Sequence, residues 1–333
     1  MPTRIVTSSE CEQLAEWGDL IDTLDAGHRA LSSGGAVQPV PQRMRTPGDT
    51  TADGAAVVPM MALASYLDLV AVKMLIDAPR NRSLGLPAQR STVSLYSAST
   101  GECLAIVDGR ALTRLRTAAV TALASRALAR PDSHSVGLIG AGALAEEHAI
   151  ALSSQFALSE VKVWSRSGES ASTLAEKLRT RGISARAVGS AEESVRGSDI
   201  VCTLTPATAP VLEVDWLSPG QHVNAVGSPP RPGYRELSAE TVGRADRVVV
   251  DSRDIALHES DNIALAQAAG QISEAEMVEL GDVLLDQTRG RSSADDLTLF
   301  NSVGIGLQDL AAAAYFVDRA TRCDIGELVS ARG

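Results

Sequence analysis

The spacing of apolar residues predicts different structures in successive parts of the chain. Residues 4–6 have the pattern of a short strand, and Ser9-Glu10-Cys11-Glu12 resembles a capping box that opens a helix. Apolar residues then recur at helical spacing as far as Gly34-Gly35, which is expected to end the helix. These helical positions are Leu14, Trp17, Leu20, Ile21 and Leu24.

Between residues 54 and 107 the pattern changes to that of strands. Four segments, AAVVPM, LVAVKMLI, TVSLYSAS and CLAIVDG, are rich in β-branched and other apolar residues. The sequence SASTGE, between the last two, supplies the turn chemistry of a hairpin. Adjacent strands joined by short turns predict a mainly antiparallel sheet.

From residue 112 strands and helices alternate. The segment LTRLRTAAVTALASRALA is predicted to be a helix, and a final Ala-rich helix is expected near 302–320. The strands predicted between these helices are 135–139, 160–164, 183–188, 199–204, 222–226 and 247–251. Six strands, most of them separated by helical or turn segments, predict a doubly wound parallel sheet. The last helix is expected to pack on the first domain, which makes the α/β part an insert.

Composition narrows the classes of function. The 333 residues are 44% apolar but only 3% aromatic, and the net charge is −11. Such an acidic chain is not expected to bind nucleic acid or an anionic membrane. Neither a leader nor a membrane-spanning run is apparent, so we expect a cytoplasmic protein. The four cysteines and five histidines are scattered without ligand spacing, so no metal site is predicted.

A glycine motif follows the first predicted parallel strand. VGLIGAGALAEEHAIAL places Gly140, Gly142 and Ala145 at a strand–turn–helix junction, the context of a dinucleotide fingerprint. Gly140 permits the tight turn, and Gly142 lets the backbone approach a pyrophosphate. The start of the helix, at Ala143 and Leu144, then offers unpaired N–H groups to the anion.

The end of the next strand indicates which dinucleotide binds. It has the sequence Trp164-Ser165-Arg166-Ser167, without the acidic residue that usually holds the ribose 2′-hydroxyl of NAD. An arginine between two hydroxyls suits a 2′-phosphate, so NADPH is predicted rather than NADH. The other interpretation is that Arg166 is a solvated charge at a strand end.

Three further segments hold candidate anion-binding side chains. Arg116-Thr117 is interpreted as the start of a helix, where a guanidinium and a hydroxyl would bind a phosphate or carboxylate. The other interpretation is an ordinary first turn with an exposed arginine. Lys73 is the only charged residue between Leu69 and Ile76, and by itself it would more often face solvent than a pocket. Arg43 and Arg45 in VPQRMRT have the same two interpretations: each faces solvent, or each enters a pocket and binds an anion.

Several segments together resemble the ornithine cyclodeaminase/mu-crystallin family. The similar stretches are VAVKMLIDAPRN, TGECLAIVDGRALTRLRTAAVTALA, GLIGAGALAEEHA, HVNAVGS, RVVVDSR and LTLFNSVGIGLQDLAAA, in family order. The resemblance implies a homodimer that acts by nicotinamide hydride transfer at the Cα of an amino or imino acid. It also implies a discontinuous substrate and dimerisation domain of α+β type, residues 1–115 with 305–333, and an inserted Rossmann domain, residues 116–304.

The resemblance also implies roles for particular residues. Lys73 is similar to the family's active-site lysine, Arg43 to the arginine that clamps the substrate carboxylate, and Arg116-Thr117 to a phosphate-contacting pair. The stretch before Arg43 is two residues longer than usual, so Arg45 stays an alternative. Segments expected to line the nicotinamide half of the cofactor are Thr205-Pro206, Val226-Gly227 and Ser302-Val303-Gly304, and Ser228 is expected on the substrate side.

One departure from the family pattern separates two branches. Ornithine cyclodeaminases carry an aspartate directly after the glycine of the NAVG segment, where this chain has Gly227-Ser228-Pro229-Pro230 and no acid before Glu236. In those enzymes a second carboxylate binds the distal amine of the substrate, and the nearest equivalent position in this chain is Ala56. A distal ammonium would then be buried without a counter-charge, which is strongly unfavourable. The segment RPGYREL is instead similar to the mu-crystallin and ketimine-reductase branch.

These observations predict an NADPH-dependent reductase of a cyclic imino acid, such as piperideine-2-carboxylate or pyrroline-2-carboxylate. Lys73, Arg43 and Arg116 are the predicted catalytic side chains, with Lys73 the candidate proton donor. The alternatives are an ornithine cyclodeaminase, a dehydrogenase of amino acids or N-substituted amino acids (including one that forms diaminopropionate), and a non-catalytic ligand-binding protein. The prolines of GSPPRPG are expected to hold a loop at the wall of the site.

Overall fold

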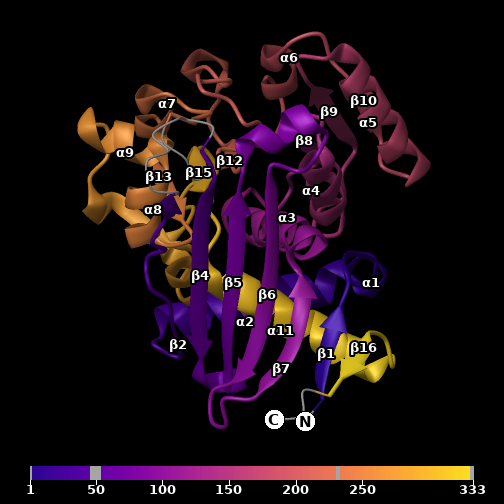
Figure 1. Ribbon diagram of the computed structural model, residues 1–333. Coiled ribbons are helices and arrows are strands. Elements are labelled where there is room, and N and C mark those ends of the chain that lie inside the picture. The colour runs from indigo at the N-terminus through magenta and orange to yellow at the C-terminus, as the bar shows by residue number, and fades with distance from the viewer. Residues whose placement is uncertain (1, 46–53, 230–232, 331–333) are drawn as a thin grey trace. The chain divides into compact units, whose positions relative to one another are not determined.

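The computed structural model describes residues 2–45, 54–229 and 233–330. The chain divides into two compact units, which Figure 1 shows as a ribbon. Unit 1 is formed by Met1–Arg116 with Ile305–Gly333, and unit 2 by Thr117–Gly304. In the described ranges, no helix is both long enough and apolar enough to cross a membrane.

Unit 1 is built on one eight-stranded sheet, sheet A, with the order β16-β1-β7-β6-β5-β4-β2 and with β3 paired to β4. Neighbouring strands from β4 to β7 are antiparallel, which confirms the predicted antiparallel sheet. β1 joins it in parallel to β7. The strands are β1 (Thr3–Val6), β2 (Ala36–Val37), β3 (Met44–Arg45), β4 (Ala56–Ala64), β5 (Leu69–Asp77), β6 (Gln89–Ser97), β7 (Cys103–Asp108) and β16 (Glu327–Val329).

Helices cover one face of sheet A, and the gold helix α11 crosses it in Figure 1. The buried side chains of β4 alternate with partly or fully exposed ones, as expected of a sheet with one covered face. A Cβ at Gly306 would lie 2.4 Å from the backbone oxygen of Met61, so glycine lets the start of α11 approach β4 closely. The helices of this unit are α1 (Ser8–Leu14), α2 (Trp17–Ser32), the first part of α3 (Gly109–Leu128), α11 (Gly306–Arg322), and the 3-10 turns η1 (Ser65–Leu67) and η2 (Pro79–Leu84).

Two predictions about helix starts in unit 1 were wrong. The first helix is capped by Thr7, which forms a capping box with Glu10, and it ends at Leu14 before a second helix begins at Trp17. Ser9 therefore lies inside the first turn. Helix α3 begins at Gly109, so Arg116-Thr117 lies in its interior, not at its start. The dipole argument for an anion at Arg116-Thr117 therefore does not apply.

Unit 2 is a parallel α/β unit whose sheet B has the order β10-β9-β8-β11-β12-β15-β13-β14. All its neighbouring strands are parallel, as predicted, but it has eight strands instead of six. The two missed strands, β14 and β15, are only three and four residues long. The strands are β8 (Ser135–Ile139), β9 (Glu160–Trp164), β10 (Ala185–Ala187), β11 (Ile200–Thr203), β12 (His222–Ala225), β13 (Arg247–Val250), β14 (Met277–Glu279) and β15 (Thr298–Asn301).

Helices and short turns connect these strands. The central strands β8, β11, β12 and β15 are buried at every residue, which is typical of a sheet covered on both faces. The connecting elements are α4 (Ala143–Ser153), α5 (Gly168–Thr180), α6 (Ala191–Val195), η3 (Val214–Trp216), α7 (Ala239–Gly243), α8 (Arg253–Glu259), α9 (Asp261–Ala268), η4 (Glu274–Glu276), α10 (Leu280–Leu285) and η5 (Gln287–Arg289). The last part of α3 also belongs to unit 2.

Candidate active site

The glycine turn after β8 fits a bound dinucleotide. Gly140 has a φ of +124°, and a Cβ there would lie 2.7 Å from the backbone oxygen of Leu204, so glycine is needed for the turn itself. A Cβ at Gly142 would meet no atom within 4 Å. Packing inside the protein therefore does not require glycine at 142, whereas close approach of a ligand to the backbone would. No side chain caps the N-terminus of α4 beside it.

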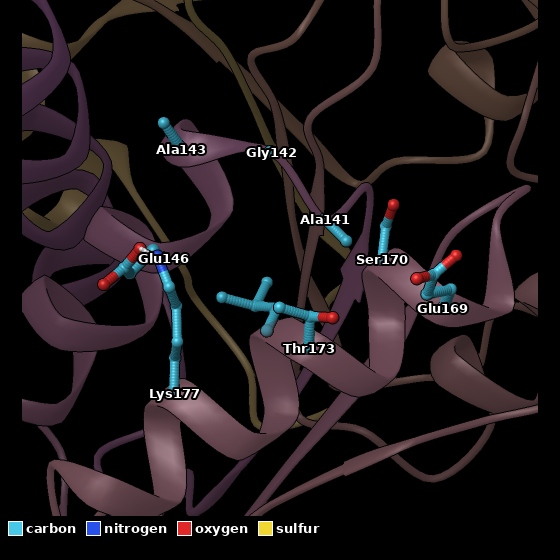
Figure 2. A pocket seen from close by; sticks show the side chains of 9 residues that line it. Ala141, Gly142, Ala143, Glu146, Glu169, Ser170, Thr173 and Lys177 are labelled. Carbon is cyan, nitrogen blue, oxygen red and sulfur yellow. Dashed lines mark hydrogen bonds and ion pairs between the residues drawn. The ribbon is translucent and has the colours of Figure 1, made fainter.

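Two clefts adjoin this turn within unit 2. The larger, of about 550 Å³, is lined by Gly140–Gly142, by Trp164–Arg166 and Ser170, and by 204–211. The smaller, of about 330 Å³, lies between the turn at Ala141–Ala143 and helix α5. Figure 2 shows Glu146 and Lys177 facing one another there, and Glu169 with Ser170 in the first turn of α5. Lys177 Nζ donates a hydrogen bond to Glu146 Oε2 at 3.2 Å.

Most residues predicted to bind the adenosine half of the cofactor lie around these clefts. Gly140, Gly142, Ser165 and Arg166 line the larger cleft, and Ala143 lines the smaller one. Leu144 follows in the first turn of α4. Arg166 is exposed and forms no ion pair with any described residue. In contrast, the hydroxyl of Ser167 caps α5 by accepting a hydrogen bond from the Ser170 N–H at 3.2 Å.

Glu236 lies at the carboxyl edge of sheet B, buried and close to Gly227. Its Oε1 accepts hydrogen bonds from the N–H and hydroxyl of Thr205, at 2.6 and 2.8 Å. Its Oε2 accepts from the hydroxyl of Thr203 and the N–H of Gly227, both at 2.8 Å. A Cβ at Gly227 would lie 2.0 Å from the Thr205 nitrogen, so glycine permits the loops after β11 and β12 to touch. Glu236 therefore ties these two loops together.

The environment of Glu236 also changes its chemistry. Burial raises the pKa of its carboxyl to about 7, although the hydrogen bonds from Thr205, Thr203 and Gly227 act in the opposite direction. The N–H groups of Thr205 and Gly227 are occupied by this carboxylate, so neither is available to a ligand. Pro206 lines the larger cleft, and Val226 is buried.

The loop that follows Gly227 contains Ser228, predicted on the substrate side. Its hydroxyl is buried and has no hydrogen-bond partner in the described part of the chain. The residues 230–232 of the proline-rich turn lie outside the described residues, so the predicted role of those prolines stays a prediction.

A second buried carboxylate holds the third predicted nicotinamide segment. Asp251, directly after β13, accepts hydrogen bonds from the hydroxyl of Ser302 at 3.1 Å and from the N–H groups of Val303 and Gly304 at 3.1 and 2.7 Å. Gly304 has a φ of +79°, a conformation that favours glycine. The segment Ser302-Val303-Gly304 is thus fixed at the carboxyl end of β15.

In unit 1, Lys73 lies on the covered face of sheet A and is 2% exposed, so the solvent-facing interpretation is excluded. Its Nζ donates to Thr113 Oγ1 at 2.8 Å and to Asp309 Oδ1 at 3.0 Å. The same Asp309 oxygen accepts from Arg116 Nε at 3.1 Å, and Arg116 also donates to Gln308 Oε1 at 3.0 Å. The second oxygen of Asp309, Oδ2, is buried and accepts no hydrogen bond from a described residue.

This arrangement lowers the proton affinity of Lys73. Burial is the largest cause and lowers the pKa of Lys73 to about 8. The nearby Arg116 acts in the same direction, while Asp309 opposes both. A buried lysine with a pKa near neutral is suited to proton transfer.

Arg43 and Arg45 occupy different environments. Arg43 lies 3.6 Å from the buried carboxylate of Asp77 and is 15% exposed, whereas Arg45 is exposed in strand β3 opposite Ala56. Asp77 pairs directly with Ala56 across the β4–β5 ladder. The neighbouring strand therefore places a carboxylate beside Ala56, and the expectation that the substrate pocket lacks a counter-charge stays a prediction.

Four buried acids around the predicted residues were not singled out from the sequence: Asp77, Glu236, Asp251 and Asp309. Only Asp251 had a local signal, an acid at the end of a Val-rich strand.

Thr117, the other half of the predicted phosphate-contacting pair, is largely buried in α3. Within the described ranges, no group of three potential ligand side chains is placed to hold a metal ion.

Comparison with known families decides the classification. Residues 1–324 match the model of the ornithine cyclodeaminase/mu-crystallin family. The chain belongs to this family. A mouse relative, ketimine reductase mu-crystallin, is 33% identical over 302 residues, which cover 90% of this chain and 91% of the relative.

Two solved structures are similar to this chain over 98% or more of its length. The Thermococcus litoralis Δ1-pyrroline-2-carboxylate reductase, in complex with NADH and L-proline, has a TM-score of 0.91 at 28% identity and covers 98% of this chain and 99% of its own. An archaeal alanine dehydrogenase dimer with bound NAD has a TM-score of 0.90 at 29% identity and covers 100% of both chains.

Proposed function

We propose that the protein is an NADPH-dependent reductase of a cyclic imino acid, of the piperideine-2-carboxylate or pyrroline-2-carboxylate type. The observation that carries this proposal is the buried Lys73, whose ammonium lies among Asp309, Thr113 and Arg116 and has a pKa of about 8. The activities named for the mouse and Thermococcus relatives support the same reaction class.

The reaction needs one hydride and one proton. A bound reduced nicotinamide supplies the hydride to C2 of the C=N bond. The imine nitrogen then takes a proton, and the product is a cyclic secondary amino acid. Lys73 is the proposed donor of that proton, and it regains a proton from water through exchange at its Nζ. Asp309 keeps the donor in place, because its Oδ1 binds both Lys73 and Arg116.

Binding of the substrate carboxylate is assigned to cations of unit 1. Arg43 is the proposed clamp, since its guanidinium is held beside Asp77 and a guanidinium can bind a carboxylate through two hydrogen bonds. Arg116 is proposed to act with Lys73 in the same network, and Ser228 to contact the substrate through its hydroxyl. Arg45, exposed in β3, is the less suitable clamp.

The proposed preference for NADPH rests on Arg166. This exposed guanidinium lines the larger cleft beside Ser165, where an NAD-specific site would carry an acid. The relatives solved with NADH and NAD show that the family also accepts the unphosphorylated cofactor. The proposed preference for NADPH therefore depends on Arg166 of this chain.

A homodimer is also proposed. The uncovered face of sheet A presents a group of exposed apolar side chains: Met61, Leu63, Met74 and Ile76. Such a patch favours association with another protein surface, and a second copy is the proposed partner because a related alanine dehydrogenase is a dimer.

The four cysteines are free, which suits the proposed cytoplasmic location.

Purified protein tests the main proposal when it is mixed with NADPH or NADH and a panel of substrates. The panel holds piperideine-2-carboxylate, pyrroline-2-carboxylate, pyruvate with ammonia, and ornithine. Oxidation of NADPH by a cyclic imine is expected, faster than with pyruvate. Proline and ammonia from ornithine would instead identify a cyclodeaminase, and binding without turnover of any substrate would identify a non-catalytic protein.

A further inference from the structure

Gln308 lies next to Asp309 in the first turn of α11 and belongs to the buried network around Lys73. Its Oε1 accepts a hydrogen bond from Arg116 Nη1 at 3.0 Å. Its Nε2 lies 3.2 Å from Nε2 of the buried His28 of α2. All these side chains belong to unit 1, and Gln308 connects the arginine to the histidine.

Arg116 fixes the orientation of the Gln308 amide. A guanidinium can only donate hydrogen bonds, so the amide oxygen must face Arg116 and the amide NH2 must face His28. Burial lowers the pKa of His28 to about 4, so its ring is neutral at physiological pH and accepts at Nε2. The oxygen of Gln308 is therefore a fixed acceptor for Arg116.

Arg116 binds only one oxygen of Asp309. Its Nε donates to Oδ1 at 3.1 Å, and the same oxygen accepts from Lys73 Nζ at 3.0 Å. The other oxygen, Oδ2, is buried and accepts no hydrogen bond from a described residue. Arginine and carboxylate side chains frequently pair through two parallel hydrogen bonds, one to each oxygen. Here a guanidinium nitrogen binds Gln308 instead.

The charged groups that act on Lys73 come from two other elements. Asp309 of α11 favours the protonated amine, and Arg116 of α3 disfavours it. Of the two strands paired with β5, β4 has no charged residue, and Arg90 of β6 is exposed. Asp77 lies further along β5 itself. The share of the Asp309 carboxylate that Arg116 occupies therefore affects how firmly Lys73 holds its proton.

We propose that Gln308 is a positioning residue that keeps Arg116 from binding both oxygens of Asp309. While Arg116 is held at Oδ1 alone, Asp309 retains negative charge for the ammonium of Lys73. Without the acceptor of Gln308, the guanidinium turns to the buried Oδ2, and Lys73 loses part of its counter-charge. The inference rests on the proposed function, since it concerns the residue to which that function assigns the proton transfer.

Titration of Lys73 tests the proposal without any turnover. The chain has three lysines, so protein labelled with 13C-lysine gives few NMR signals, and the Lys73 signal is the one that Lys73→Ala lacks. Gln308→Met removes the acceptor and keeps an unbranched side chain of similar length. The midpoint of the Lys73 titration, about 8 in the wild type, is expected to fall by about one pH unit in this variant. Gln308→Glu keeps an acceptor for Arg116 and is expected to keep or raise the midpoint.

The pH profile of imine reduction should follow the titration. At pH 8, kcat of Gln308→Met is expected to be about fivefold below the wild-type value, because less of Lys73 is protonated. At pH 6 the two values should be nearly equal, because Lys73 is protonated in both proteins. A general defect in packing would instead lower kcat at both pH values.

A second buried glutamine provides the matched control. Gln221 of unit 2 donates from Nε2 to the carbonyl oxygens of Val195 and Ser198, at 2.9 and 2.7 Å. Gln221→Met should lower the melting temperature and leave the midpoint of Lys73 unchanged. Gln308→Leu replaces Gln308→Met in every comparison if the methionine variant does not fold.

Three outcomes overturn the inference. The first is a Lys73 midpoint that does not fall when Gln308 is replaced by Met or Leu. The second is an equal fall of the midpoint in Gln221→Met, and the third is a fall in Gln308→Glu. A wild type that reduces no cyclic imine refutes the proposed function instead, and the titration of Lys73 still decides whether Gln308 positions Arg116.

Discussion

Units 1 and 2 stabilise their buried carboxylates in different ways. In unit 1, Asp309 is paired with Lys73 and Arg116, and Asp77 with Arg43. In unit 2, Glu236 and Asp251 accept hydrogen bonds from backbone N–H groups and hydroxyls.

This difference indicates that the buried carboxylates of the two units have different roles. Ion pairs can exchange partners with a charged ligand, and one oxygen of Asp309 accepts no hydrogen bond from a described residue. The oxygens of Glu236 are instead both engaged, with two donors each. We infer that the charged groups of unit 1 act on the substrate, while the carboxylates of unit 2 hold the loops after β11, β12 and β15 in place.

Removal of the Lys73 amine is expected to have the largest effect. Lys73→Ala should lower kcat for imine reduction by about 1,000-fold, because the proposed proton donor is lost. Arg116 still pairs with Asp309 in this variant, so the fold and the cofactor affinity should be retained. The rate is measured by NADPH oxidation, and the affinity by nicotinamide fluorescence. A variant that retains a tenth or more of the wild-type kcat would show that another group donates the proton.

Removal of the Glu236 carboxylate should disturb unit 2 without removing a reacting group. Glu236→Ala leaves the partly buried N–H of Thr205 without its acceptor, at a cost of about 1–3 kcal/mol, and leaves the Gly227 N–H with the Thr203 carbonyl as its acceptor. We expect a lower melting temperature and faster amide exchange at Thr205. Glu240→Ala, an exposed acid of α7, is the matched control. Unchanged exchange at Thr205 would contradict the positioning role.

The rate of reduction should fall as pH rises. The pKa of Lys73 is lowered to about 8, so above that pH the amine is increasingly neutral and the proposed acid is lost. For one proton with this pKa, kcat should drop about tenfold between pH 7 and pH 9. Stability should change in the opposite direction: between about pH 8 and pH 10.5 the folded state binds fewer protons at Lys73 than the unfolded state, so the cost of burying the charged amine falls and the free energy of unfolding increases as pH rises. A kcat that is flat over this range would exclude Lys73 as the titrating donor.

The smallest expected effect concerns the cofactor. Arg166→Ala should raise the KM for NADPH about fivefold and leave the KM for NADH nearly unchanged, because an exposed arginine–phosphate contact is screened by solvent. Arg244→Ala, which changes another exposed arginine of unit 2, should alter neither value. Equal effects of Arg166→Ala on both cofactors would remove the argument for a 2′-phosphate site.

Local patterns predicted the framework of both units, and long-range contacts explain what was missed. The glycine turn at Gly140 and the strand around Lys73 are short segments whose residue types are decisive by themselves. Asp309 lies 236 residues after Lys73 and reaches it only because α11 packs on sheet A. Glu236 appeared in the sequence as an acid too distant to replace the absent aspartate, but its loop returns to Gly227. Strand β14 was missed because three residues carry little periodicity.

Transfer of deuterium from C4 of NADPH to C2 of the cyclic imine is the most direct test of the proposed hydride transfer. Wild-type protein is incubated with piperideine-2-carboxylate and NADPH that carries deuterium in both C4 positions, and the product is analysed by mass spectrometry and NMR. We expect pipecolate with one deuterium at C2 for each NADP⁺ formed. A product without deuterium at C2, or an imine that is left unchanged while the cofactor stays bound, would contradict it.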